Sequence, residues 1–166
     1  MTEKRLSSLR ATAHPLRLRM LSLLTGVSMS ATEVARELGI SHANASYHLR
    51  LLAGAGLLEV EGEERIRGGV AKRYRHVWDV EKPAMGRDDV EHELRAMTSE
   101  LVRRAAQRDG TVLLADAELW VAPEAWERVL ALLTEAATLV HEAAVPPRAE
   151  GSVPVNVSVA AFRMSK

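Results

Sequence analysis

The sequence predicts an α+β protein of two parts, and three patterns lead to this prediction. Apolar residues recur at helical spacing through much of the first 54 residues. Two runs of strand-forming residues then flank a pair of glycines. Farther along, two more such runs enclose a long amphipathic helix. We therefore expect a helical domain with a β-hairpin over residues 1–82, followed by an α-β-α-β region over residues 83–166.

The first part opens with helices. Residues 3–12 can form a short one, and Pro15 suits the first position of the next, where its missing N–H costs nothing. Met20 and Leu24 belong to the apolar stripe of this second helix, and Gly26 ends it.

Two shorter helices follow. Ser30 and Glu33 have the S-x-x-E spacing of a capping box, so a helix should begin there and end at Gly39. Ser41 is a second N-cap candidate and opens a helix over residues 42–54. Two short helices joined by a glycine-containing turn, with a supporting helix before them, form the pattern of a helix-turn-helix.

A β-hairpin follows these helices directly. Leu58 and Ile66 belong to its first predicted strand, Gly68 and Gly69 to the turn, and residues 70–78 to the return strand. A hairpin placed directly after a helix-turn-helix is a wing. The first part is therefore expected to be a winged helix-turn-helix domain.

The second part begins near Pro83. We expect a charged helix over residues 88–108, a strand at 111–122, a helix at 123–144 and a strand with alternating valines at 153–164. A helix between two strands lets them run parallel. Because two strands make a poor sheet alone, a second copy in a homodimer or the 88–108 helix should complete it.

Composition limits the possible functions. The chain is 47% hydrophobic, contains no cysteine and has no run of 18 apolar residues, so we expect a cytoplasmic protein without thiolate sites or membrane spans. Its net charge is zero, but residues 1–85 carry 13 basic and 9 acidic side chains, and residues 86–166 reverse that balance. Such asymmetry is expected when only the first half meets a polyanion.

The stretch SHANASYHLR, residues 41–50, groups polar side chains that suit a metal site, DNA contacts or a solvated helix face. Ala45 and Leu49 recur at helical spacing and should point to the core. His42 and His48 then lie about 120° apart around the axis and cannot chelate one ion. His48 is expected to pack at the edge of the buried side, with a phosphate contact as the alternative.

DNA recognition fits this helix better than metal binding. A recognition helix enters the major groove with its N-terminal residues against base edges. Asn44 can pair with adenine through two hydrogen bonds, and Arg50 can reach guanine or a phosphate. Free backbone N–H groups at the helix start favour a phosphate. The residues assigned to DNA on this helix are Ser41, His42, Ala43, Asn44, Ser46, Tyr47 and Arg50.

The predicted wing adds basic side chains, with no acid between residues 65 and 75. A run of charged residues usually forms a solvent-exposed face without further function. A basic run beside a helix-turn-helix instead favours contact with DNA. We assign Arg65, Arg67, Lys72 and Arg73 to the DNA backbone or the minor groove, where arginine is favoured. Glutamates on the opposite strand moderate this field.

Three segments together resemble the ArsR-type winged-helix repressors: HPLRLRMLSLL (14–24), SATEVARELGIS (30–41) and ASYHLRLLAGAGLLEV (45–60). The resemblance covers about residues 8–78. It implies a homodimeric transcriptional regulator that binds double-stranded DNA, usually a repressor released by an effector. It also suggests that the C-terminal extension serves dimer contacts.

Metal sensing at the sites known in this family is not expected, and no cofactor is predicted. The helix EVARELG lacks the paired cysteines of one such site. Asp89 and His92 share a helical face, but zinc needs at least three protein ligands. No nucleophile elbow, phosphate loop or paired catalytic carboxylates indicate an enzyme.

Two alternatives to a simple repressor remain open. The winged helix can serve protein contacts without binding DNA, or the C-terminal region can sense a small molecule. Trp120, Trp126 and Phe162 would then line an effector pocket, although a core or a dimer interface accounts for them as well.

Overall fold

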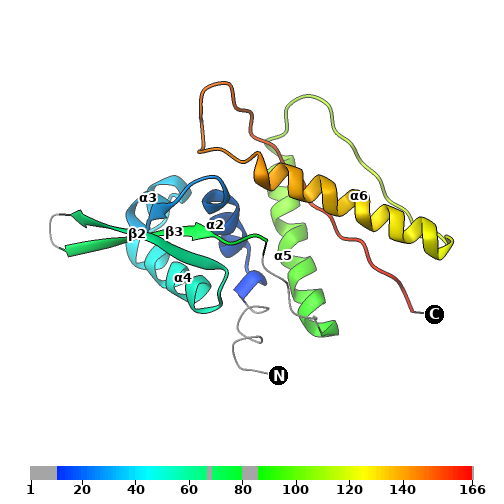
Figure 1. The fold of residues 1–166 in the computed structure, drawn as a ribbon, viewed down its shortest axis with the longest axis horizontal. Helices are drawn as coiled ribbons and strands as arrows, with labels where there is room; N and C mark the ends of the chain where they lie inside the picture. Colours follow the sequence, from blue (N-terminus) through cyan, green and yellow to red (C-terminus); the bar gives the residue numbers. More distant parts are fainter. Residues whose placement is uncertain (1–10, 67–68, 80–85, 166) are drawn as a thin grey trace.

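The computed structural model describes residues 11–66, 69–79 and 86–165. A compact group of helices carries a hairpin that protrudes on one side, and two longer helices lie on the other (Figure 1). The helix predicted over residues 3–12 lies mostly outside the described residues, and the predicted domain boundary between 82 and 83 lies entirely outside them. Within the described part, no helix is long and apolar enough to cross a membrane.

The N-terminal helices are α2 (Pro15–Thr25), α3 (Ala31–Leu38) and α4 (His42–Gly54). They confirm the predicted helices and their starting points. Each begins after a residue whose side chain accepts a hydrogen bond from a backbone N–H of the first turn. These N-cap residues are His14, Ser30 and Ser41.

The wing is also confirmed. It consists of β2 (Leu58–Ile66) and β3 (Gly69–His76), which pair antiparallel. A third strand, β1 (Met29–Ser30), pairs with β3 and gives the sheet order β1-β3-β2. Sequence patterns missed β1 because two residues are too few to show an alternation of period two.

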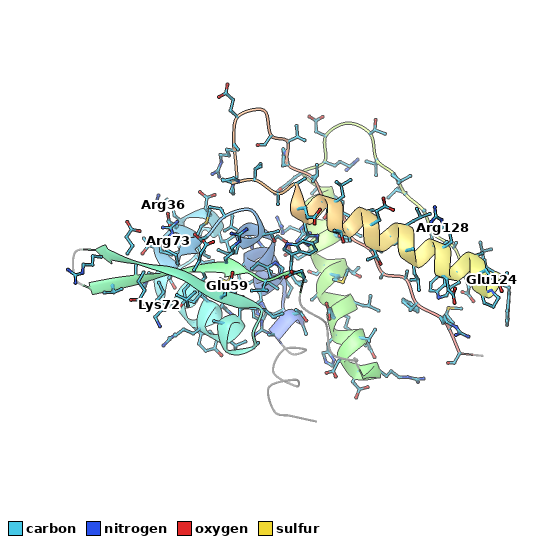
Figure 2. The ribbon with its side chains drawn as sticks, viewed as in Figure 1. Arg36, Glu59, Lys72, Arg73, Glu124 and Arg128 are labelled. Atoms are coloured by element: carbon cyan, nitrogen blue, oxygen red, sulfur yellow. The ribbon has the colours of Figure 1, made fainter. Side chains whose placement is uncertain are left out.

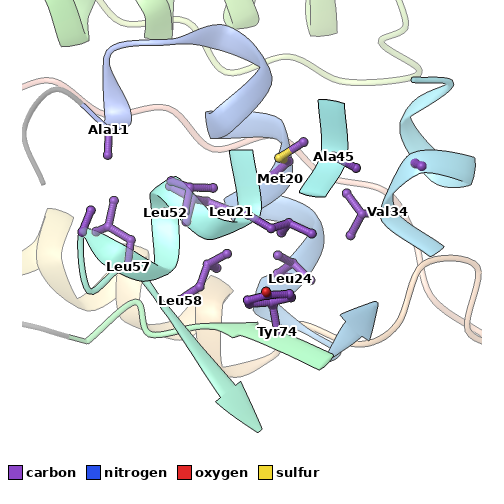
Figure 3. Close-up of a cluster of buried hydrophobic side chains, with 13 residues drawn as sticks. Ala11, Met20, Leu21, Leu24, Val34, Ala45, Leu52, Leu57, Leu58 and Tyr74 are labelled. Atoms are coloured by element: carbon purple, nitrogen blue, oxygen red, sulfur yellow. The ribbon is translucent and has the colours of Figure 1, made fainter. Parts of the chain in front are cut away.

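The core lies between the three helices and the base of the hairpin (Figure 3). Leu58 and Tyr74 close it from the hairpin side. Burial of Ala45 and Leu49 confirms the predicted phase of α4. The largest fully buried side chains are Met20, Leu24, Val34, Leu49 and Leu52.

The C-terminal part contains the two predicted helices, α5 (Arg87–Ala105) and α6 (Pro123–Glu142). α5 packs beside α2 (Figure 1). It buries the Glu100 carboxylate, which forms ion pairs with Arg103 at 2.7 Å and Arg104 at 3.6 Å. None of the residues of α6 is buried, although one face of this helix is apolar.

The two strands predicted at 111–122 and 153–164 are wrong for this chain alone. Both segments lack regular secondary structure and pair with no strand in the described part of the chain. Alternating valines express a preference for extended backbone, but a strand forms only where a neighbour satisfies its N–H and C=O groups. Among residues 86–165 no neighbouring strand is present. The predicted strand-helix-strand region is therefore a helix between two coil segments.

Contacts distant in sequence attach the C-terminal part to the helical layer. Trp78 stacks on His141 at the end of α6, with ring centroids 5.1 Å apart. Arg148 forms an ion pair with Glu37 of α3 at 3.0 Å. Gly26 lies so close to the following loop that a Cβ there would be 2.6 Å from the Val145 carbonyl oxygen.

Candidate nucleic-acid interface

The turn between α3 and α4 depends on Gly39. This residue has φ 65°, in the left-handed region that favours glycine, and its N–H donates to carbonyls of the last turn of α3. The N–H of Ile40 donates to the Ala35 carbonyl at 3.0 Å. Ser41 then caps α4 by accepting a hydrogen bond from the Asn44 N–H at 3.2 Å. The turn ends α3 and starts α4 within three residues.

α4 has one buried and one polar exposed face. Ala45, His48, Leu49 and Leu52 are buried. The seven residues assigned to DNA lie on the remaining surface: Ser46 is half-buried, and Ser41, His42, Ala43, Asn44, Tyr47 and Arg50 are exposed. The structure thus brings all seven onto one continuous surface of a single helix.

The start of α4 is electrostatically open to an anion. Its first turn contains no acidic side chain. The unpaired N–H groups and the helix dipole therefore keep their positive character there. Farther along, the Nε of Arg50 donates to the Ser46 carbonyl at 3.2 Å, which holds the arginine stem along the exposed face.

Beneath this face lies a pair of histidine rings. His48 is 9% exposed, and its ring centroid is 5.2 Å from that of His14. Its Nδ1 has no hydrogen-bond partner among the residues that the structure describes. Burial lowers the pKa of His48, and the charges of His14 and Arg17 lower it further. Burial also lowers the pKa of His14. His48 is therefore a packed residue that supports Tyr47, whose ring lies edge-on at 5.1 Å.

Some cations of the wing are exposed to solvent, and others form ion pairs within the domain. Lys72 and Arg73 project from opposite faces of the hairpin, as neighbours in a strand must (Figure 2). Arg65 and Lys72 are exposed and form no ion pair with any described residue. Arg67, at the predicted tip, lies outside the described residues.

Arg73 is held inside the domain. Its guanidinium donates to Glu33 at 3.0 Å, to Glu64 at 3.3 Å and to the Ser28 carbonyl at 2.6 Å. Glu33 also forms the capping box of α3 with Ser30. Burial by itself raises the pKa of Glu33. Hydrogen bonds from Ser30 and the charge of Arg73 lower it by more, so the net shift of the pKa is downward. Arg73 therefore connects the wing to the first helix of the helix-turn-helix.

A second ion pair lies near the base of the wing. Arg75 donates to Glu61 at 2.8 Å. A hydrogen bond from Ser28 lowers the pKa of Glu61, and Arg75 lowers it further. The register of β2 and β3 shifts between Val60 and Gly62, which leaves Glu61 as the extra residue of a bulge. Glutamates of β2 thus engage two of the wing's arginines.

Arg36 is a candidate that sequence patterns missed. It is exposed in the last turn of α3, just before the turn into α4. Figure 2 shows it on the same side of the hairpin as Arg73. The signal in the sequence is a lone cation on the outer side of a helix whose other features, the capping box and the apolar stripe, report only on folding.

The described residues 11–66, 69–79 and 86–165 contain no group of three His, Cys, Asp or Glu side chains placed to hold a metal ion. On α5, the Nδ1 of His92 lies 2.6 Å from the Asp88 carbonyl oxygen. This histidine is thus engaged with its own helix.

Comparison with known protein families matches residues 12–61 to a helix-turn-helix domain. The match extends from just before α2 into β2 and includes the whole of α4. A helix-turn-helix domain suggests DNA-binding regulation and a non-enzymatic protein. No curated protein matches the chain.

Proposed function

We propose that this protein is a sequence-specific transcriptional regulator of the ArsR type, acting as a dimeric repressor on an inverted repeat. One observation carries the proposal. α4 buries Ala45, Leu49 and Leu52 on one face and exposes a polar face of hydrogen-bonding side chains, between a glycine turn and a wing. A helix of this kind is what the major groove accepts.

In this proposal the first two turns of α4 read base edges. Asn44 pairs with adenine through its amide, and His42 and Tyr47 contact neighbouring positions. Ala43 permits close approach because its side chain is a single methyl group. A base contact of this kind contributes about 1–3 kcal/mol of discrimination against the wrong base.

Backbone contacts then orient the protein on the duplex. The N–H groups at Ser41 face a phosphate. Arg36, Arg65 and Lys72 supply exposed cations on α3 and the wing, the elements that precede and follow α4 in the chain. We assign Arg73 a different role, because its three intramolecular contacts position the wing. Phosphate contacts carry no sequence information but fix the register of the helix in the groove.

The repressor and inverted-repeat parts of the proposal rest on the resemblance of residues 8–78 to ArsR-type proteins and on symmetry. A two-fold dimer binds two half-sites related by the same axis. An effector that changes the C-terminal part would alter the spacing of the two α4 helices. The loop contacts at Gly26 and Glu37 offer a route for that change.

The decisive experiment is selection of bound sites from random DNA with the full chain. We expect an enriched palindromic sequence, and Asn44→Ala should lose preference at one position of each half-site. Ser99→Ala, an exposed position on α5, is the matched control and should select the wild-type sequence. Failure to enrich any sequence at low salt would overturn the proposal.

A second candidate is a winged helix that serves protein contacts without DNA. The observation that favours it is the pairing of Arg73 and Arg75 with glutamates in a chain of zero net charge. A domain that binds DNA usually presents a surplus of cations. The same selection separates the two candidates, because a protein-contact module enriches no DNA at any salt concentration.

A further inference from the structure

The C-terminal part leaves an unusually large apolar surface uncovered. Leu113 is 93% exposed, Leu114 is 88% exposed and Val153 is 75% exposed. Scattered exposed apolar residues are normal, but a large continuous set marks an interface. Further exposed apolar side chains from α6 and the two coil segments are Leu119, Leu132, Leu139, Val155, Val157 and Phe162.

The total surface area supports the same conclusion. The chain exposes 12423 Å². A folded monomer of 18.2 kDa is expected to expose about 8,100 Å². The excess, about 4,300 Å², is larger than the roughly 1,000–2,500 Å² that each partner contributes to an obligate homodimer. The exposed area is therefore large enough to supply a dimer interface.

The segment 153–164 has the chemistry of an unpaired strand. Residues 151–162 carry no charged side chain, so the segment lacks the charges that usually protect a sheet edge from pairing. Arg104 of α5 donates to the Asn156 side chain at 3.1 Å, and Ser158 donates to the same oxygen. Because side chains alternate along extended backbone, Val155 and Val157 lie on the face opposite to these polar contacts.

We propose that a second copy of this chain covers this surface, with segments 111–122 and 153–164 of both copies joining one shared β-sheet. Each chain supplies two segments that cannot form a stable sheet alone, and two chains supply four. A two-fold arrangement brings the same edge of both copies together and closes after two chains, so the pairing does not propagate into a fibre.

This inference rests on the proposed function, because it specifies which surface forms the dimer of the proposed regulator. The arrangement also leaves the proposed DNA contacts accessible. The wing protrudes on the side of the helical layer away from α5 and α6 (Figure 1). A dimer built through the C-terminal parts therefore leaves α4 and the wing of each copy uncovered.

The test measures molar mass by light scattering across a concentration series of the full chain without DNA. We expect a dimer, with amide-exchange protection over residues 153–164 that appears together with the dimer mass. Val157→Asp should raise the dimer dissociation constant by about tenfold or more, because it places a charge on an apolar surface that the second copy covers in the proposed dimer. Ser158→Asp, on the opposite face of the same segment, is the matched control and should dimerise as the wild type does.

Leu113→Asp provides a second variant that cannot disturb the isolated chain, because this side chain is 93% exposed there. It too should weaken the dimer by about tenfold or more. A wild-type monomer at every concentration, or equal dimerisation by Val157→Asp and Ser158→Asp, would overturn the inference. Both results are obtained without DNA. A monomer that still selects a half-site sequence would thus overturn the shared sheet and leave DNA recognition intact.

Discussion

At the scale of single residues, the histidines beneath α4 show how burial shapes the DNA-facing helix. The Nδ1 of His14 accepts a hydrogen bond from the Leu16 N–H at 3.1 Å, so that nitrogen carries no proton. His48 packs against it, and no described residue forms a hydrogen bond with the Nδ1 of His48. Burial lowers the pKa of both rings and thus favours their neutral forms, between the start of α2 and the helix that we assign to the major groove.

This pair should make the domain sensitive to acid. The pKa of His48 is lowered from 6.5, so the unfolded chain binds the proton more readily than the folded one. The stabilising contribution is therefore complete above about pH 6.5 and is lost as pH falls through the folded pKa. The urea midpoint of the wild type should fall between pH 7.5 and pH 5.5. His48→Gln should reduce that fall.

The control for this prediction is His42→Gln, which removes an exposed histidine from the same helix. It should lose stability on acidification to the same extent as the wild type. If His48→Gln and the wild type show equal losses between the two pH values, the neutral pair is not responsible for the acid sensitivity.

Lys72 and Arg73 show that sequence patterns cannot distinguish an exposed cation from one that forms ion pairs within the domain. Both are basic residues in one predicted strand, and both were assigned to DNA. Which of them is retained inside the domain depends on Glu33, 40 residues away in sequence. A pattern along the chain records charge and spacing but not long-range partners. The α4 residues were easier to place because helical phase alone fixes which of them are exposed.

The two neighbours should therefore respond differently to substitution. Lys72→Ala should leave stability unchanged and reduce the salt dependence of DNA binding by about one unit of slope. Arg73→Ala should lower the free energy of unfolding by about 1–2 kcal/mol, because a partly buried arginine loses charged hydrogen bonds. Salt titrations of DNA affinity and urea unfolding measure the two effects. Equal effects of both variants on stability would contradict the assignment.

At the scale of elements, local signals predicted the helices of the described chain, and long-range pairing decided the strands. Caps, glycine stops and apolar stripes lie within a few residues of each helix, so α2 through α6 were found with their approximate ends. The hairpin was also local, because its strands are joined by a short turn. Segments 111–122 and 153–164 carry strand preference, but their pairing partner is not specified by neighbouring residues.

The capping box of α3 offers a test of such a local signal. The Glu33 carboxylate accepts from the Ser30 backbone N–H at 2.7 Å and from its hydroxyl at 2.9 Å. Ser30→Ala should lower the free energy of unfolding by about 1 kcal/mol, since an N-cap side chain is lost. Chemical unfolding checks this value, with Ser99→Ala as an exposed serine control. An unchanged free energy would show that the backbone N–H bond to Glu33 alone suffices.

At the scale of the whole molecule, the helix-turn-helix and the apolar C-terminal surface lie in different parts of the fold. This separation predicts how DNA spacing should matter. In the proposed dimer the two α4 helices reach half-sites about 10 bp apart or a multiple of that. Inserting 5 bp between the half-sites turns one of them to the opposite face of the duplex. Affinity should then fall to that of a single half-site.

Gel shifts on the selected palindrome and on its expanded version measure this dependence. Leu113→Asp is the informative control, because a monomer binds both DNA molecules with the same half-site affinity. A wild-type protein that tolerates the insertion fully would contradict a fixed geometry between the two recognition helices.

At Gly26 the addition of one methyl group would affect a part of the chain that is distant in sequence, the loop after α6. Gly26 ends α2 and lies directly under the Val145 backbone, where even an alanine Cβ would collide with the carbonyl oxygen at 2.6 Å. An alanine there would force the Val145 backbone of the loop after α6 to shift, although Gly26 itself belongs neither to the DNA-facing residues of α4 nor to the segments 111–122 and 153–164. Gly26→Ala thus provides a way to tune communication between the two halves without altering the chemistry of either.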